Sequence, residues 1–213
     1  MKRRPLVLAL LSLPLAPLAR AGVSLREPVI GACDGCEAVF DGLPLAPGSR
    51  ARIAPIGEPG EPLTLTGTVT DLRGQPQPGV IVYAYHTDRG GLYPPPDVAT
   101  AGAARRHGRL RGWARTDGNG GYRFDTIRPG AYPREQMAEH IHMHVIEPGR
   151  ATYYLDDVVF RDDPKLTARQ IHALSGGRGG NSIATPERRD GVWRVRRDIV
   201  LGQNVPGYPP ART

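Results

Sequence analysis

Alternation of apolar and polar residues through the middle of the chain predicts β-strands. Residues 63–70 alternate in this way, residues 79–87 are rich in β-branched and aromatic side chains, and turn-forming residues lie between them. We expect these two segments to be neighbouring strands. The same criteria predict five further strands, at residues 112–116, 121–125, 140–147, 153–160 and 192–200.

Helix is predicted at one place, residues 167–174, where Thr167 and Gln170 have capping-box spacing. The chain has 27 glycines and 22 prolines among 213 residues, which excludes a helical bundle or coiled coil because both residue types destabilise helix interiors. Residues 46–62 are rich in both and show no sustained period. We therefore expect an N-terminal arm over residues 22–62, followed by one all-β domain of the sandwich type over residues 63–213.

The first 21 residues have the pattern of an export signal. A charged region, an apolar run and a small-residue cleavage site follow one another: Lys2, Arg3 and Arg4, then residues 6–18, then Ala19-Arg20-Ala21. The apolar run is too short to span a bilayer, and no later stretch is long enough for a stable span. We expect cleavage near Ala21 and export to the periplasm or beyond the cell. An uncleaved anchor is the alternative, and the choice between the Sec and twin-arginine routes stays open.

The positive charge of the chain is concentrated in this segment. The formal net charge is +7, and removing residues 1–21 takes away four basic side chains and no acidic one, leaving +3. The basic composition therefore does not indicate a nucleic-acid partner.

Cys33 and Cys36 are the only cysteines, and they are separated by Asp34 and Gly35. In an exported chain this pair predicts a small disulfide loop. A thioredoxin-like redox role would need a stable helix after the pair, and the residues that follow are soon interrupted by glycine and proline. Two cysteines alone do not complete a structural zinc site.

Three histidines share one face of the predicted strand 140–147. Side chains alternate across a strand, so His140, His142 and His144 point to one side and the apolar residues 141, 143 and 145 to the other. The apolar side can pack on the core. Three imidazoles then point together to the opposite side, which predicts a transition-metal site.

Two tyrosines narrow the choice of metal. Tyr93 follows a glycine-containing turn, and Tyr132 follows Pro129-Gly130-Ala131 just before the histidines. A phenolate is a hard, strongly donating anion, so tyrosine combined with histidine favours ferric iron. Either tyrosine taken alone is explained equally well as a core or turn residue.

The order of these residues resembles the intradiol ring-cleavage dioxygenases, a family that includes catechol and protocatechuate 3,4-dioxygenases. The likeness covers roughly residues 63–164 and rests on an ordered set of short motifs: Gly67-x-Val69-x-Asp71-x-x-Gly74-x-Pro76, Asp88-x-x-Gly91-x-Tyr93, Arg111-Gly112-x-x-x-Thr116-Asp117-x-x-Gly120-x-Tyr122-x-Phe124, Thr126-Ile127-x-Pro129-Gly130-x-Tyr132 and His140-Ile141-His142. The set is specific because of its order, whereas each motif alone is weak.

This resemblance implies a twisted β-sandwich of mixed sheets with short helical segments, and a non-haem Fe(III) site. By matching position, the iron ligands are Tyr93, Tyr132, His140 and His142. His144 lies on the same face, where it is a rim residue, a hydrogen-bonding partner of a ligand or a competing ligand. The implied reaction opens a catechol with O2 between its two hydroxyls to a muconate-type diacid, with Tyr132 leaving the metal to act as a base.

The sequence departs from the family pattern at residues that matter for activity. Family members carry an arginine three residues before the first ligand histidine, and Met137 stands here. Arg134 or Arg128 is expected to stabilise negative charge in its place. The glutamine of the following strand aligns with Asp157, at the rim or next to a ligand. A short loop between Tyr132 and His140, together with the basic residues 105–111, predicts an open, cationic entrance.

Two other functions stay open on sequence alone. The motifs at residues 67–76 and 116–122 also resemble transthyretin-like and carboxypeptidase-regulatory sandwiches, which predicts a non-catalytic binding module. The other alternative is an exported copper or zinc binder that uses His140, His142 and His144. Metal content and colour separate the three hypotheses. The particular catechol and the oligomeric state, including a homo-oligomer, also stay open.

Overall fold

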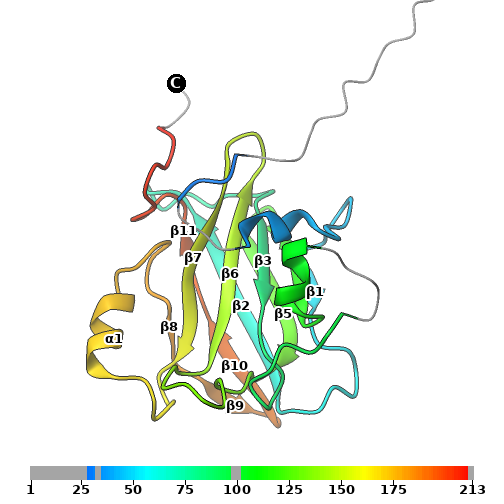
Figure 1. The fold of residues 1–213 in the computed structure, drawn as a ribbon. Helices are drawn as coiled ribbons and strands as arrows, with labels where there is room; N and C mark the ends of the chain where they lie inside the picture. The colour runs from blue at the N-terminus through cyan, green and yellow to red at the C-terminus, as the bar shows by residue number, and fades with distance from the viewer. Residues whose placement is uncertain (1–27, 32–34, 97–101, 211–213) are drawn as a thin grey trace, which may run out of the picture.

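The computed structural model describes residues 28–31, 35–96 and 102–210. In it, two β-sheets pack face to face (Figure 1). The first sheet has the order β1-β5-β2-β10-β9, with β11 also paired to β2; the strands are β1 (Arg50–Arg52), β5 (Gly121–Ile127), β2 (Pro62–Thr70), β10 (Val192–Arg196), β9 (Glu187–Arg189) and β11 (Ile199–Val200). The second has the order β4-β3-β6-β7-β8; its strands are β4 (Arg111–Arg115), β3 (Ile81–Tyr85), β6 (His140–Glu147), β7 (Ala151–Phe160) and β8 (Ile183–Ala184). The predicted all-β sandwich of mixed sheets is therefore confirmed.

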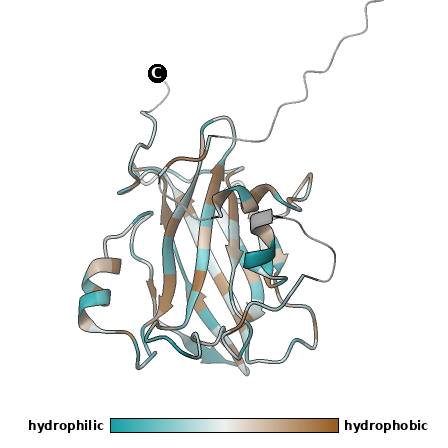
Figure 2. Ribbon diagram, in the orientation of Figure 1, coloured by the Kyte–Doolittle hydropathy of each residue, from teal (hydrophilic) through white to brown (hydrophobic). Residues whose placement is uncertain are grey.

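The core between the sheets is made by the apolar half of each alternating strand. Leu65 of β2 and Phe124 of β5 are fully buried from the first sheet, and Ile141 and Met143 of β6 meet them from the second. Hydrophobic and hydrophilic residues alternate along these strands in Figure 2. Burying such side chains contributes about 1.5–3 kcal/mol each, so this face fixes the strand register.

A second apolar cluster covers the outer face of the second sheet. Tyr83 and Tyr85 of β3 pack there against Val39, which lies in the short 3₁₀ helix η1 (Cys36–Phe40). The 3₁₀ helix η2 (Gly102–His107) lies beside η1 on the same side of the molecule (Figure 1). β3 is consequently buried on both faces, unlike the outer strands of either sheet.

Residues 63–70 and 79–87 form β2 and β3 as predicted, but they are not neighbouring strands. β2 pairs with β5, β10 and β11 in one sheet, and β3 pairs with β4 and β6 in the other. The segment between them carries the chain from one layer to the other, with Asp71 Oδ1 accepting hydrogen bonds from the backbone N–H groups of Arg73 and Gln75. The prediction of adjacent strands was wrong because the turn signal does not distinguish a hairpin from a crossover.

The predicted strand at residues 192–200 is divided into β10 and β11. Arg197, between them, is buried, and its guanidinium donates hydrogen bonds to backbone carbonyls that include those of Gly179 and Asn181. Three short strands were not predicted: β1, β8 and β9. β1 comes from the arm region and pairs in parallel with β5, so residues 50–52 extend the first sheet.

The predicted helix is present as α1 (Ala168–Leu174), with the Thr167–Gln170 capping box formed. Among the described residues, no helix is long and apolar enough to cross a membrane. The predicted export signal at residues 1–21 lies outside the described residues, as does Cys33.

Candidate metal centre

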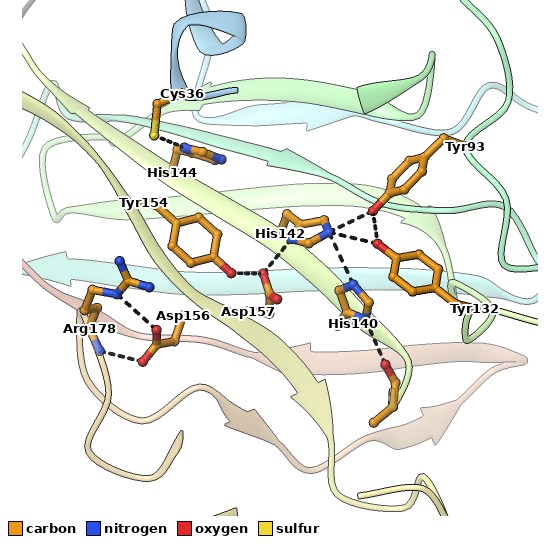
Figure 3. A network of polar contacts seen from close by, with 11 residues as sticks. Cys36, Tyr93, Tyr132, His140, His142, His144, Tyr154, Asp156, Asp157 and Arg178 are labelled. Carbon is orange, nitrogen blue, oxygen red and sulfur yellow. Dashed lines mark hydrogen bonds and ion pairs between the residues drawn. The ribbon is translucent and has the colours of Figure 1, made fainter. Parts of the chain in front are cut away.

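Four polar side chains converge on the outer face of the second sheet (Figure 3). Tyr93 Oη lies 2.5 Å from Tyr132 Oη and 2.7 Å from His142 Nε2. His142 Nε2 also lies 3.2 Å from His140 Nε2 and 3.4 Å from Tyr132 Oη. The structure thus brings together the four residues that the sequence analysis selected as ligands, two from β6 and two from loops.

Hydrogen bonds at the far side of each imidazole set its tautomer. His140 Nδ1 lies 2.8 Å from the carbonyl oxygen of Ala138, and His142 Nδ1 lies 2.7 Å from Asp157 Oδ1. Because a carbonyl and a carboxylate only accept hydrogen bonds, we assign the proton of each neutral ring to Nδ1. Both Nε2 lone pairs then point into the same space, 3.2 Å apart, where the Tyr93 phenol can donate a hydrogen bond to that of His142 and a cation would bind both.

The protonation of the four groups also fits a cation site. Burial lowers the pKa of His140, so its neutral, metal-binding form prevails at neutral pH. Burial, and then hydrogen bonding to Tyr132, raises the pKa of Tyr93 far above its ordinary value, and burial likewise raises the pKa of Tyr132. Neither phenol ionises here without a strong positive charge beside it, so the donor set fits a highly charged metal ion.

The two loops that carry the tyrosines pack against each other backbone to backbone. At Gly91, where φ is +78°, an added Cβ would collide with the carbonyl oxygen of Ala131, and at Gly130 it would collide with that of Arg89. Thr87 Oγ1 donates a 2.7 Å hydrogen bond to the carbonyl oxygen of Gly130. The absence of side chains at both glycines therefore sets the distance between Tyr93 and Tyr132.

A Gly130→Ala substitution should destabilise the protein by about 1–3 kcal/mol, because the new methyl group has to push the two tyrosine loops apart. It should also weaken metal binding at the candidate site. Thermal unfolding and metal analysis measure the two effects. The matched control is Gly118→Ala, where a Cβ meets nothing within 4 Å and φ is not left-handed. Equal melting temperatures for the two variants would contradict the proposed role of this contact.

An irregularity in β7 turns Asp157 toward the histidines. Ile141 pairs with Val158 and Met143 pairs with Leu155, so three steps along β7 match two steps along β6. Leu155 and Val158 both face the core, and the extra residue leaves Asp156 and Asp157 on the outer face. This is the geometry of a β-bulge, which re-aims side chains that regular alternation would place elsewhere.

Asp157 is a hydrogen-bonding partner of the candidate ligand His142. It accepts from His142 Nδ1 and, at 2.5 Å, from Tyr154 Oη (Figure 3). Burial alone would raise the pKa of Asp157, but its interactions with the neighbouring groups, first the hydrogen bond from His142, outweigh burial and the net pKa is lowered, so the residue is a carboxylate. A ring nitrogen of His140, a ring nitrogen of His142 and a carboxylate oxygen of Asp157 lie within 4.8 Å of one another. Asp157 is nevertheless bonded to His142 Nδ1, which points away from the tyrosines.

His144 lies outside the group of four. It is buried, its Nδ1 is 3.5 Å from Cys36 Sγ, and its ring packs edge-on against Tyr154 with a centroid separation of 5.2 Å. Burial, and then the neighbouring His107 and His142, lower the pKa of His144 to about 3, so the ring is neutral. Since Cys33 is outside the described residues, the Cys33–Cys36 disulfide stays a prediction.

Two arginines were expected to replace the family arginine at position 137, where Met137 is exposed. Arg128 donates to Glu139 and Asp162, and its guanidinium stacks between the rings of Phe160 and Trp193 at 4.9 and 5.0 Å. Because these contacts engage the guanidinium of Arg128, its role is structural. Arg134 is exposed and lies two residues after Tyr132. Of Arg128 and Arg134, it is therefore the one that can reach a substrate.

The sequence analysis missed Tyr85 and Tyr154. The ring of Tyr85 stacks on His142 at 4.5 Å and on His107 at 3.7 Å, which fixes the plane of His142. Tyr85 is the direct cross-strand neighbour of His142, so a correct β3–β6 register would have identified it. Tyr154 is the cross-strand neighbour of His144, so the β6–β7 register would have identified it as well, but its contact with Asp157 depends on the bulge in β7, which leaves no signal in the pattern.

Comparisons with known proteins point to one protein family. A family model described as Dioxygenase matches residues 48–178. Hydroxyquinol 1,2-dioxygenase of Nocardioides simplex is 33% identical in an alignment of 169 positions that covers 68% of this chain and 56% of the relative. The β chain of protocatechuate 3,4-dioxygenase of Burkholderia cepacia is 32% identical in an alignment of 124 positions that covers 52% of this chain and 49% of the relative. The chain spans about half the length of these curated relatives.

Solved structures share the fold. The dioxygenase domain of a dioxygenase and carbohydrate-binding fusion protein from Streptomyces sp. SirexAA-E has a TM-score of 0.57 at 24% identity, covering 82% of this chain and 98% of that one. Catechol 1,2-dioxygenase from Acinetobacter sp. ADP1 has a TM-score of 0.56 at 22% identity, covering 79% and 63%. At these identities the likeness establishes the sandwich alone.

A β-sandwich that gathers two phenols and two imidazoles on the outer face of one sheet matches the ring-cleaving dioxygenase class. The family model covers more than half of the sequence. The chain belongs to the intradiol ring-cleavage dioxygenase family.

Proposed function

We propose that this protein is a non-haem Fe(III) dioxygenase that cleaves a catechol between its two hydroxyls and releases a muconate-type diacid. The observation that carries the proposal is the convergence of Tyr93, Tyr132, His140 and His142, with both Nε2 lone pairs directed into the same space. Two phenolates and two neutral imidazoles suit ferric iron better than a divalent ion. When bound, ferric iron would bind the catecholate and make its ring reactive toward O2.

The residues of this chain supply orientation and proton transfer. Asp157 and the carbonyl of Ala138 hold the two imidazoles with Nε2 toward the site. Tyr132 is partly exposed, as are Tyr93 and His142, whereas His140 is buried, so a substrate hydroxyl can reach the Tyr132 side of the site. We assign Tyr132 Oη as the base that takes one proton from the substrate, with Tyr93 Oη, 2.5 Å away, hydrogen-bonded to it.

The two alternative functions have less support. A copper or zinc site built on three histidines would need His144 beside His140 and His142, but the Nδ1 of its ring lies at Cys36. A non-catalytic module has no use for two tyrosine loops held together at Gly91 and Gly130.

The substrate is a catechol whose substituents are not assigned. The curated relatives are named for hydroxyquinol and protocatechuate, so the panel to test is catechol itself and these two compounds. We also propose export, on the pattern of residues 1–21. The test of the function is oxygen uptake by the iron-loaded protein with each substrate, followed by product identification. A ring-opened diacid supports intradiol cleavage, whereas a semialdehyde or the absence of oxygen uptake across the panel contradicts it.

Turnover should be slow, and Arg134→Ala should slow it further. Met137 provides no charge at the family arginine position, and losing one such donor typically costs ~10²- to 10³-fold in rate. If Arg134 compensates, its removal lowers kcat by roughly tenfold or more while the iron content stays the same. Steady-state oxygen uptake measures kcat, and Arg161→Ala, an exposed arginine after β7, is the control. An unchanged kcat in Arg134→Ala would show that Arg134 has not replaced the missing arginine.

A further inference from the structure

The outer face of the first sheet carries arginines from four of its strands. The register places Arg50 opposite Arg123, and Thr66 lies between Arg123 and Arg196 on the neighbouring strands. The same alternation puts further arginines on this face, namely Arg52, Arg194 and Arg189. We call these six arginines, with the threonines of β2 between them, the arginine face. Because the site lies on the outer face of the other sheet, the arginine face is on the opposite side of the sandwich.

The charges on this face are not balanced. Three acidic residues lie on or beside it, and each is paired with an arginine: Asp125 with Arg123, Asp198 with Arg196, and Glu187 with Arg189. The side chains of Arg50, Arg52 and Arg194 are exposed and make no side-chain hydrogen bond or ion pair with another described residue, although Arg52 lies opposite Asp125 and Arg194 opposite Glu187 in the strand register. Arg50 directly opposite Arg123 is a like-charge pair, which costs stability in an isolated sheet. An anion bound between such pairs would relieve that cost.

The arginines flank a row of hydroxyl groups. Thr66, Thr68 and Thr70 of β2 are partly exposed along the middle of the sheet and span ~13 Å at the usual rise per strand residue, whereas Thr64 is buried and bonded to Asp125. Arg50, Arg52 and Arg123 lie on one side of this row, and Arg194 and Arg196 lie on the other. An extended ligand along β2 would therefore meet guanidinium groups on both sides and hydroxyls beneath.

The side chains of the arginine face suit some classes of polyanion better than others. None of the residues that the register places on it is aromatic, so it lacks the stacking platform that single-stranded nucleic acid needs. It is a sheet face with no projecting helix or ribbon to enter a duplex groove, and no exposed large apolar side chain to insert into a membrane. Guanidinium groups match carboxylates in paired hydrogen bonds, and threonine hydroxyls match the hydroxyls of sugars.

We propose that the arginine face binds an extended acidic polysaccharide whose sugars carry carboxylates. Binding there leaves the Tyr93 and His142 side of the molecule open, so a polymer-bound protein still admits small substrates. Affinity falls as salt rises, because each contact is an exposed ion pair.

The test measures binding of polygalacturonate to the full chain by affinity electrophoresis and calorimetry at physiological ionic strength, with neutral dextran as the blank. The triple variant Arg50→Gln, Arg52→Gln, Arg194→Gln should bind at least tenfold more weakly. The matched control is Arg73→Gln, Arg161→Gln, Arg169→Gln, which removes the same charge from exposed arginines outside the face. The control should bind like the unmodified protein. Circular dichroism and bound iron confirm that both triple variants are folded.

Four results would overturn the proposal. The first is that polygalacturonate does not bind, and the second is that the two triple variants lose the same amount of affinity for it. The third is that a single-stranded oligonucleotide or anionic phosphatidylserine vesicles bind more tightly than polygalacturonate, and that this binding is lost in the face variant. The fourth is a change of oligomeric state in the face variant alone. The last would make the face an interface between copies of this chain. None of these results depends on ring cleavage.

Discussion

A Tyr93→Phe variant should fold normally, lose its visible colour and bind little iron. The phenol oxygen of Tyr93 lies within 2.7 Å of both Tyr132 Oη and His142 Nε2, so it is the central donor of the candidate site. Removing it leaves the ring and its packing in place but takes away one anionic ligand of the proposed iron site, and with it the tyrosinate-to-iron charge transfer expected to colour the iron-loaded protein. The absorption spectrum and the iron content per chain measure the effect.

Two controls make this result specific. Tyr208→Phe removes a hydroxyl that is bonded to Glu147, far along the chain from the site, and should keep the colour. His142→Ala should lose iron, whereas His144→Ala should retain it because His144 contacts Cys36 and Tyr154 instead of Tyr93 and Tyr132. An unmodified protein that is colourless and carries stoichiometric zinc or copper after iron-replete expression would contradict the ferric site itself.

Asp157→Ala should weaken iron binding by about 10- to 100-fold, the usual effect of removing the hydrogen-bond partner of a metal-binding histidine. Asp157 Oδ1 accepts from His142 Nδ1 and from Tyr154 Oη, so its loss frees the imidazole to rotate and to change tautomer. Asp157→Asn keeps one acceptor oxygen and should lose less. Competition with a chelator, followed in the visible band, measures the affinities.

The adjacent carboxylate supplies the control for this prediction. Asp156 also lies on the outer face, but it pairs with Arg178 instead of a histidine, so Asp156→Ala should keep its iron affinity. If Asp157→Ala lost iron as completely as His142→Ala and its visible band moved, Asp157 would be a ligand and the assignment of Tyr132 or Tyr93 would have to change.

Strand β6 could be predicted to the residue because both of its faces are informative. Its apolar residues, such as Ile141 and Met143, identify the side that faces the core, and its histidines, such as His142, identify the side that carries the candidate site. The alternation and the residue types therefore predict the same two faces. The partner of each strand could not be predicted, because pairing depends on side chains far apart in the sequence. The turn after β2 has the composition of a hairpin, yet it leads β3 into the other sheet.

The candidate ligands were identified by their types and order, but the residues that orient them were not. Regular alternation from Leu155 puts Asp157 on the core side, and only the extra residue opposite β6 reverses this. The contact between Gly91 and Gly130 was equally hidden, because a glycine in a turn motif is explained by its own φ without any partner.

The opposite faces of β6 have an evolutionary consequence. The residues that hold the sandwich together, such as Ile141 and Met143, point away from the candidate site, while His140 and His142 contribute nothing to the packing between the sheets. A lineage can therefore exchange its reaction, or lose it, through a few substitutions on one side of a strand without hollowing the interior. Descendants of such an ancestor would keep the same architecture and differ in chemistry, so the histidines and tyrosines, more than the shape, are the features by which active members should be sorted from inactive ones.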